Sequence, residues 1–167
     1  MKPTAGLSST SAGEFIDVSR TLLAGDYLPK LQQCAELLTD DDLWWRPNES
    51  SNSIGNMLLH LCGNLRDWIV GGVGGATIER DRSAEFSARG SMPLDDLMTE
   101  VKSTLRDVDR ALADLKEDSL LEQIEVQGFQ VTRLQAVYHA IEHFGYHLGQ
   151  VVYVTKLRTG KDLEIFP

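Results

Sequence analysis

Apolar residues recur at steps of three and four along most of the chain, a spacing that predicts amphipathic helices. The first such stretch covers residues 15–38 and continues past Gly25 and Pro29. Proline lacks a backbone N–H and clashes with the preceding turn, so Pro29 is expected to kink this helix or to end its first part. A second helix is predicted from about residue 54 to residue 70, with Ser53 as its N-terminal cap.

Two further helices complete the pattern. A third is predicted to open at Pro93, because proline suits the first turn of a helix. A fourth is predicted over residues 133–157, capped by Thr132 and stopped by Thr159 and Gly160. Four amphipathic helices of these lengths predict an all-α fold, a four-helix bundle, whose interior can host a metal site built from facing helices.

The connections between these helices carry turn formers and charges. Residues 39–53 break the apolar pattern at an aspartate run, and Pro47 argues against helix just before it. Residues 120–131 alternate around Gly128, which favours a short hairpin-like crossover. The longest loop, residues 71–92, is either a solvated excursion or a lid whose charged residues reach back over a site. These charged residues are Arg80, Asp81, Arg82 and Glu85.

Composition narrows the class of protein and its partners. The 167 residues are 42% hydrophobic, which suits a single domain over residues 1–167, with residues 1–12 as a flexible leader. A net charge of −9 works against nucleic acid or anionic membrane, so a small molecule or another protein is the expected partner. No apolar stretch approaches the roughly 20 residues that span a bilayer, and a hydrophobic signal core is lacking, so a soluble, cytoplasmic protein is expected. Cys34 and Cys62 form no CxxC and are expected to be free thiols.

The histidines carry the strongest chemical signal. Three of the four, His139, His143 and His147, follow one another at one-turn steps, and His60 stands alone on the second predicted helix. His139 and His147 lie roughly 12 Å apart along a helix, too far to share one ion, so an adjacent pair must be chosen. Spacing leaves His139 with His143 and His143 with His147 equally good. His60 could supply a third ligand from a facing helix, or the histidines could be packed core residues without a metal.

A three-histidine site would have the pattern of a catalytic centre, because three protein ligands leave one position open for water or substrate. Zinc, nickel, iron and manganese all accept imidazole ligands. Phe144 follows His143, so this is not the HExxH zinc-protease motif. Asn64 and Glu142 are the nearest polar candidates for support of the ligands or proton transfer, and the alternative for Glu142 is that it faces solvent. Three residues could line an approach to the site or plug the end of the bundle: Trp44, Trp45 and Arg46.

The segments SIGNMLLHLCGNLRDWI, GGVGG with RDRSAEF, and HAIEHFGYHLGQVVYVTKL closely resemble the DinB-like (YfiT-like) family of metalloenzymes, in particular a branch described as a domain of unknown function. The likeness extends from the first helix to the end of the last. It implies a bacterial four-helix bundle with a long crossover, frequent homodimers, and a divalent metal held by one histidine of the second helix and an HxxxH pair of the last.

Carried onto this chain, the resemblance implies that His60, His143 and His147 are the ligands and that His139 is not. Gln150 stands three residues after the last ligand, as in the family. Tyr146 and Leu148 depart from it, because many members carry a histidine and an arginine around that ligand, which puts a role of those groups in substrate binding in doubt.

Two classes of function are then compatible with the sequence. The resemblance implies a metal-dependent enzyme that activates a small, low-molecular-weight thiol, as S-transferases and isomerases do, or water, as hydrolases do. The alternative is a non-catalytic metal-binding or stress-associated helical bundle whose ion stabilises the fold. A fourth protein ligand would favour the structural role, and an open position in a pocket would favour catalysis.

Overall fold

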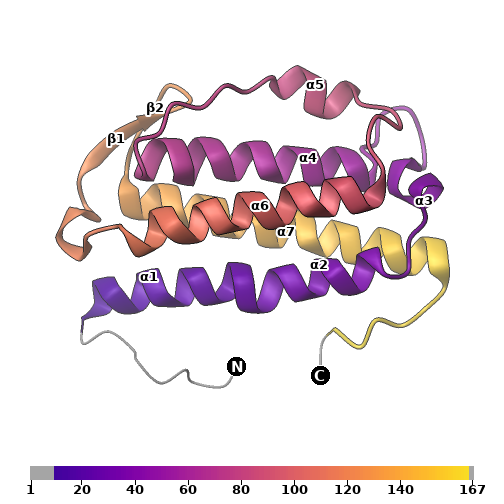
Figure 1. Ribbon diagram of the computed structural model, residues 1–167, viewed down its shortest axis with the longest axis horizontal. Coiled ribbons are helices and arrows are strands. Elements are labelled where there is room, and N and C mark those ends of the chain that lie inside the picture. Colours follow the sequence, from indigo (N-terminus) through magenta and orange to yellow (C-terminus); the bar gives the residue numbers. More distant parts are fainter. Residues whose placement is uncertain (1–9, 166–167) are drawn as a thin grey trace.

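The computed structural model describes residues 10–165 and is mostly helical, with one two-stranded sheet (Figure 1). Most of the leader predicted at residues 1–12 lies outside the described residues, and the first helix begins inside it, at Ser11. The elements are α1 (Ser11–Thr21), η1 (Leu22–Tyr27), α2 (Leu28–Ala35), α3 (Asp40–Trp44), α4 (Ile54–Leu65), η2 (Arg66–Val73), α5 (Arg82–Ser87), α6 (Leu94–Ala113), η3 (Glu117–Ser119), β1 (Gln123–Val126), β2 (Phe129–Thr132) and α7 (Arg133–Thr159).

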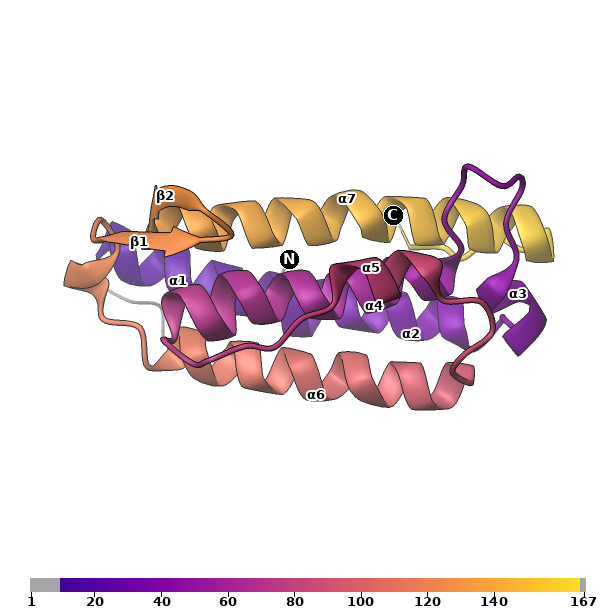
Figure 2. The same ribbon diagram turned by 90° about the horizontal axis from the view of Figure 1, so that it is seen from above.

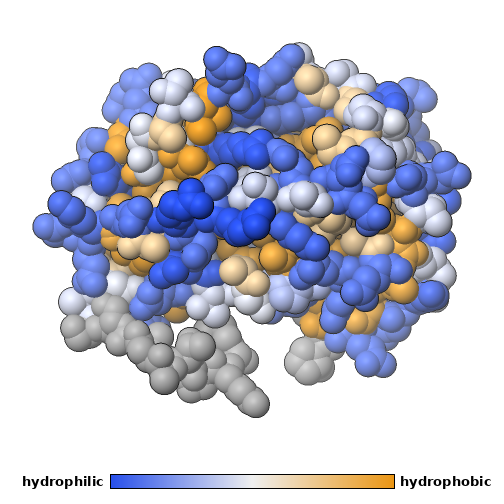
Figure 3. All heavy atoms as spheres, viewed as in Figure 1, coloured by the Kyte–Doolittle hydropathy of each residue, from blue (hydrophilic) through white to orange (hydrophobic). Residues whose placement is uncertain are grey.

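The long helical segments lie side by side and enclose one apolar core (Figures 1 and 2). Helix α7 packs against α2, α4 and η2, and α6 packs against α4, η2 and α2. Hydrophilic side chains gather over α6 on the face shown in Figure 3, as expected for a helix with one apolar stripe. Within residues 10–165, the helices lack the combination of length and apolar character that crossing a membrane requires. Cys34 and Cys62 are buried free thiols, as predicted.

The chain passes Pro29 without leaving the helical conformation. The segment η1 is a π-helix, and the N–H of Leu28 donates to the carbonyl of Leu23, five residues back. This wider turn comes directly before Pro29, which sits in the first turn of α2. A π-helical segment re-routes the hydrogen bonds where proline lacks its donor and would clash with the turn before it. The interruption predicted at this proline is therefore a change of helix type.

Polar caps set the ends of the helices. Ser53 and Thr132 each form a capping box at the start of α4 and α7, as predicted, and Gly160 ends α7 with a left-handed φ of 65°. The structure corrects the prediction for residues 39–53, which were expected to connect without helix. Thr39 caps the short helix α3, and the aspartates that break the apolar pattern are its favourable first turn.

Two connections frame the region between α4 and α7. Residues 74–93, here called the strap, follow α4 along its outer side and contain α5, a helix that the sequence pattern did not predict (Figures 1 and 2). The hairpin predicted around Gly128 is confirmed, since β1 and β2 pair antiparallel with Val126 opposite Phe129. Gln127 and Gly128 both have positive φ, 53° and 82°, as a two-residue hairpin turn requires.

The packing at the start of α4 leaves no room for a side chain at Gly55. A Cβ at this position would lie 2.9 Å from ring atoms of Trp44, whose indole N–H is fixed by a hydrogen bond to the carbonyl of Met92. A Cβ at Gly149, on α7, would meet nothing within 4 Å. We expect Gly55→Ala to lower the free energy of unfolding in urea by about 1–3 kcal/mol. The control Gly149→Ala should leave it unchanged or raise it by roughly 0.5–1 kcal/mol, and equal losses in both variants would contradict this packing.

Candidate metal centre

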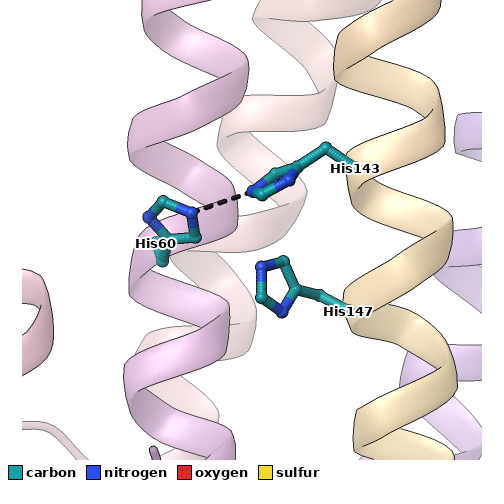
Figure 4. A group of neighbouring side chains, drawn as sticks. All are labelled: His60, His143 and His147. Atoms are coloured by element: carbon teal, nitrogen blue, oxygen red, sulfur yellow. Dashed lines mark hydrogen bonds between the residues drawn. The ribbon is translucent and has the colours of Figure 1, made fainter.

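Three histidines from two helices point toward one another (Figure 4). His60 comes from α4, and His143 and His147 come from successive turns of α7, which packs against α4. Their ligand atoms all lie within 4.8 Å of one another, and the Nε2 atoms of His60 and His143 are 2.9 Å apart. His60 is buried and the other two are half-buried. One-turn spacing on α7 and a single histidine on the facing helix thus produce a compact imidazole cluster.

Hydrogen bonds at the far side of two rings define their tautomers. The carboxylate oxygen Oε2 of Glu85 lies 3.0 Å from Nδ1 of His60, and the amide oxygen Oε1 of Gln150 lies 2.7 Å from Nδ1 of His147. Both oxygens accept, so both Nδ1 atoms carry the proton and both Nε2 atoms offer a lone pair. The Nε2 of His143 is then the donor in its contact with Nε2 of His60. In its other neutral tautomer, with the proton at Nδ1, His143 would offer a third Nε2 lone pair to a cation.

Glu85 reaches His60 from the strap, and Arg80 holds it there. Nε of Arg80 lies 2.5 Å from Oε1 of Glu85, and Nη2 lies 2.8 Å from Oε2. Nη2 is also 3.2 Å from Nδ1 of His60. Both of these nitrogens are donors, so the carboxylate is the shared acceptor that brings them together. The Arg80 and Glu85 side chains are each 9% exposed, and a bidentate ion pair of this kind satisfies two charges that would be costly to bury alone.

The network continues from Arg80 to the hairpin. Nη1 of Arg80 lies 2.8 Å from Oδ2 of Asp67 in η2, and the side-chain amide of Gln127 donates to the same oxygen at 2.8 Å. Gly63 leaves room for the ion pair on α4. A Cβ there would overlap the Glu85 carboxylate and lie 2.5 Å from Nε of Arg80. Strap, hairpin and α4 are therefore joined through one buried arginine.

Burial keeps the cluster neutral. It lowers the pKa of His143 to about 4, and the neighbouring histidines and Arg80 push in the same direction. Burial also lowers the pKa of His60, against the opposing effect of Glu85, and it lowers the pKa of His147, against the hydrogen bond that His147 donates to Gln150. Neutral imidazole is the form that binds a metal ion, so the three rings are ready to act as ligands at neutral pH.

His139 lies outside the group of possible ligands. Its ring packs against Trp68, with ring centroids 4.2 Å apart, and stacks on His143 at 5.6 Å. Asn64, one turn after His60, is buried, and its Oδ1 has no hydrogen-bond partner among the described residues. Glu142 is exposed on α7, in line with the expectation that it could face solvent. Of the two polar candidates, Asn64 alone is enclosed by the protein.

The tryptophan pair makes contacts of its own at the α3 end of the molecule. Trp44 covers Gly55 and donates to Met92, and the guanidinium of Arg158 lies 4.8 Å from the Trp45 ring. Arg46 pairs with the exposed Glu49 at 3.2 Å. These contacts fit the packing role that the sequence left open for Trp44, Trp45 and Arg46.

Some of the charged strap residues reach back toward the histidines, as expected of a lid, and the others face solvent, as expected of a solvated loop. Arg80 and Glu85 reach back to His60, as a lid would. Asp81 caps α5, and Arg82 is exposed above Phe86, whose ring lies 4.8 Å from that of His60. Sequence alone could not select Glu85 from the charge run, because the contact depends on how the strap folds over α4. Gly63 is a local sign of a close approach on that face, because a Cβ there would overlap the Glu85 carboxylate.

The helical fold is shared with solved structures, one of which is described as DinB-like. The structure is similar to a crystal structure of a conserved protein from Enterococcus faecalis, with a TM-score of 0.73 and 17% identity over 87% of this chain and 97% of that one. It is also similar to a DinB-like protein from Bacillus cereus, with a TM-score of 0.68 and 15% identity over 90% and 93% of the two chains. At these identities the likeness shows the fold alone.

The chain belongs to the DUF1572 family, which is described as a protein of unknown function and whose model matches residues 11–166. This is the branch of DinB-like proteins that the sequence resembles. No curated protein matches the chain at a significant level.

Acid should destabilise the metal-free protein through these histidines. Their folded pKa values lie below the ordinary value of 6.5, so the unfolded chain binds more protons as the pH falls. The stability that they contribute is complete above pH 6.5 and is lost as the pH falls toward about 4. We expect the free energy of unfolding in chelator to drop between pH 7 and pH 5, with His143 accounting for on the order of 1 kcal/mol after solvent screening. His143→Gln should reduce this pH dependence, and an unchanged slope would contradict it.

Proposed function

We propose that this protein is a metal-dependent enzyme of the DinB-like type, in which His60, His143 and His147 hold one divalent ion. The observation that carries the proposal is the convergence of three neutral imidazoles. Two of them donate a hydrogen bond from Nδ1–H, His60 to Glu85 and His147 to Gln150. Imidazole ligands suit zinc or nickel best, and iron or manganese also accept them. When bound, such an ion supplies positive charge that lowers the pKa of a small thiol or of water.

The protein's own residues orient the ligands and shield them. Glu85 accepts a hydrogen bond from the Nδ1–H of His60 and orients its ring, and Arg80 holds that carboxylate in place through an ion pair. Gln150 does the same for His147 with a neutral amide. Hydrogen bonds of this kind set the tautomer of a metal-binding histidine and increase its basicity. Phe86 closes the strap side of His60 with an apolar ring.

Support for catalysis over a structural ion comes from the number of ligands. Within residues 10–165 the group with suitable spacing contains three histidines and no fourth histidine, cysteine or carboxylate. Three protein ligands leave a position for a reactant, whereas structural zinc sites use four. Asn64, buried and with a free Oδ1, is the candidate for a hydrogen bond to substrate, and Glu142 is a candidate for proton transfer with solvent.

The proposal also covers the architecture around the site. We infer that the rods α1–η1–α2, α4–η2, α6 and α7 act as a four-helix bundle and that residues 1–167 form one domain. Their mutual contacts support this, because each rod touches at least two others. A site between α4 and α7 would then be held on both sides by the bundle core.

Metal analysis of the purified protein tests the site. We expect about one divalent ion per chain, and His60→Ala, His143→Ala and His147→Ala should each lower the bound metal at least tenfold because each removes one of three ligands. His139→Ala is the matched control, since it removes a histidine of the same helix that lies outside the ligand group. Unchanged metal content in the three ligand variants would reject the proposal.

Turnover by the metal-loaded protein separates the two reaction classes. Small thiols with electrophilic partners test the transferase version, and simple esters and amides test the hydrolase version. Failure with every thiol, alongside clear hydrolysis of an ester or amide, would reject the transferase version. Full metal binding without turnover of any of these compounds would favour the non-catalytic bundle.

Glu85→Gln tests the role of the strap in the metal centre. The amide can still accept from His60, but it loses the charge that pairs with Arg80, so we expect metal affinity to fall about 10- to 100-fold in competition with a chelator. Glu79→Gln changes an exposed glutamate of the same strap and should leave the affinity unchanged. Equal affinities of the two variants would show that Glu85 does not position His60.

A further inference from the structure

A pocket of about 560 Å³ opens beside the histidine cluster, between α7 and the segment that leads into α4. Two of its lining residues contact His147. Gln150 accepts a hydrogen bond from the Nδ1–H of that histidine, and the Tyr146 ring lies edge-on to its imidazole with centroids 5.5 Å apart. Met57, another lining residue, stands one turn before His60 on α4. A molecule in this pocket would therefore touch Gln150, the side chain that orients His147.

The lining of the pocket is uncharged. None of the described residues that line it is acidic or basic, although 25% of the chain is charged. An anionic ligand would gain no ion pair there and would approach a protein with a net charge of −9. Desolvating a carboxylate without a partner is costly, so this pocket discriminates against anions.

The uncharged lining combines flat aromatic surfaces with hydrogen-bonding groups. Tyr146 and Tyr153 line the pocket while 62% and 69% exposed, so their ring faces are available to a planar group. Met57 and Val154 add apolar surface. Gln150 uses its oxygen for His147, which leaves its amide NH₂ as a donor toward a ligand.

We propose that this pocket binds the substrate and that the substrate is a neutral, partly apolar molecule with a planar hydrogen-bonding group. The statement about substrate rests on the proposed function, and it selects uncharged thiols or uncharged esters and amides over their anionic counterparts. The statement about the pocket rests on its lining alone.

Benzamide and benzoate are matched probes for the pocket, because they share a ring and differ in charge. Calorimetric titration in the presence of a chelator, of the wild type and of His143→Ala, should show benzamide binding at least about tenfold more tightly than benzoate in both, since no bound ion is then present to coordinate the carboxylate. Tyr153→Ala should weaken benzamide about fivefold, and Tyr138→Ala, which alters an equally exposed tyrosine outside the lining, should not. Asn52→Lys should strengthen benzoate about tenfold without changing bound metal.

Benzoate binding as tightly as benzamide, absence of benzamide binding, or equal effects of the two tyrosine variants would overturn the pocket. The substrate class is tested on metal-loaded protein with N-acetylcysteamine and N-acetylcysteine, a thiol pair that differs by one carboxylate. Preference for the neutral thiol supports the proposal, and preference for the anionic thiol overturns it. If the protein binds no metal, the proposed function fails, while the benzamide result still decides the pocket.

Discussion

The ion pair between Arg80 and Glu85 is the interaction on which the rest of the site depends. Both side chains are nearly buried, and charges in that position are tolerated only when each has a partner. Glu85 has Arg80 and His60, and Arg80 has Glu85 and Asp67. These contacts hold the strap against α4 and help to orient the ring of His60 toward the two histidines on α7.

The histidine cluster places polar rings inside a mainly apolar core. Between α4 and α7, a mainly apolar core gives way to three neutral imidazoles, the stacked His139 and the buried Asn64. Neutral rings cost less to bury than charged ones, and the lowered pKa of His143 records the desolvation of its charged form. The hydrogen bond between the Nε2 atoms of His60 and His143 offsets part of this cost.

The sequence could predict what depends on neighbours in the chain. Periodicity predicted the long helices, and Ser53, Thr132 and Gly160 predicted their ends, because caps and apolar stripes act within one or two turns. The apolar pattern did not predict α3, because its aspartates were counted as helix breakers although they directly follow the capping residue Thr39. Spacing on one helix could not choose between two histidine pairs. The resemblance to the DinB-like family made that choice, whereas the contact of Glu85 with His60 could be seen only in the folded strap.

The two sides of the cluster differ in a way that bears on how a reactant reaches it. His60 is held by a carboxylate paired with arginine, under a strap and against the Phe86 ring. His147 is held by the neutral amide of Gln150, which also lines an open pocket. Separating the buried Glu85 carboxylate from Arg80 would leave a charge without a partner, which is costly. The neutral amide of Gln150, beside an open pocket, can change hydrogen-bond partners at a smaller cost. Under the proposed function, a reactant would approach from the His147 side, where it would meet tyrosine rings and an amide before a charged side chain.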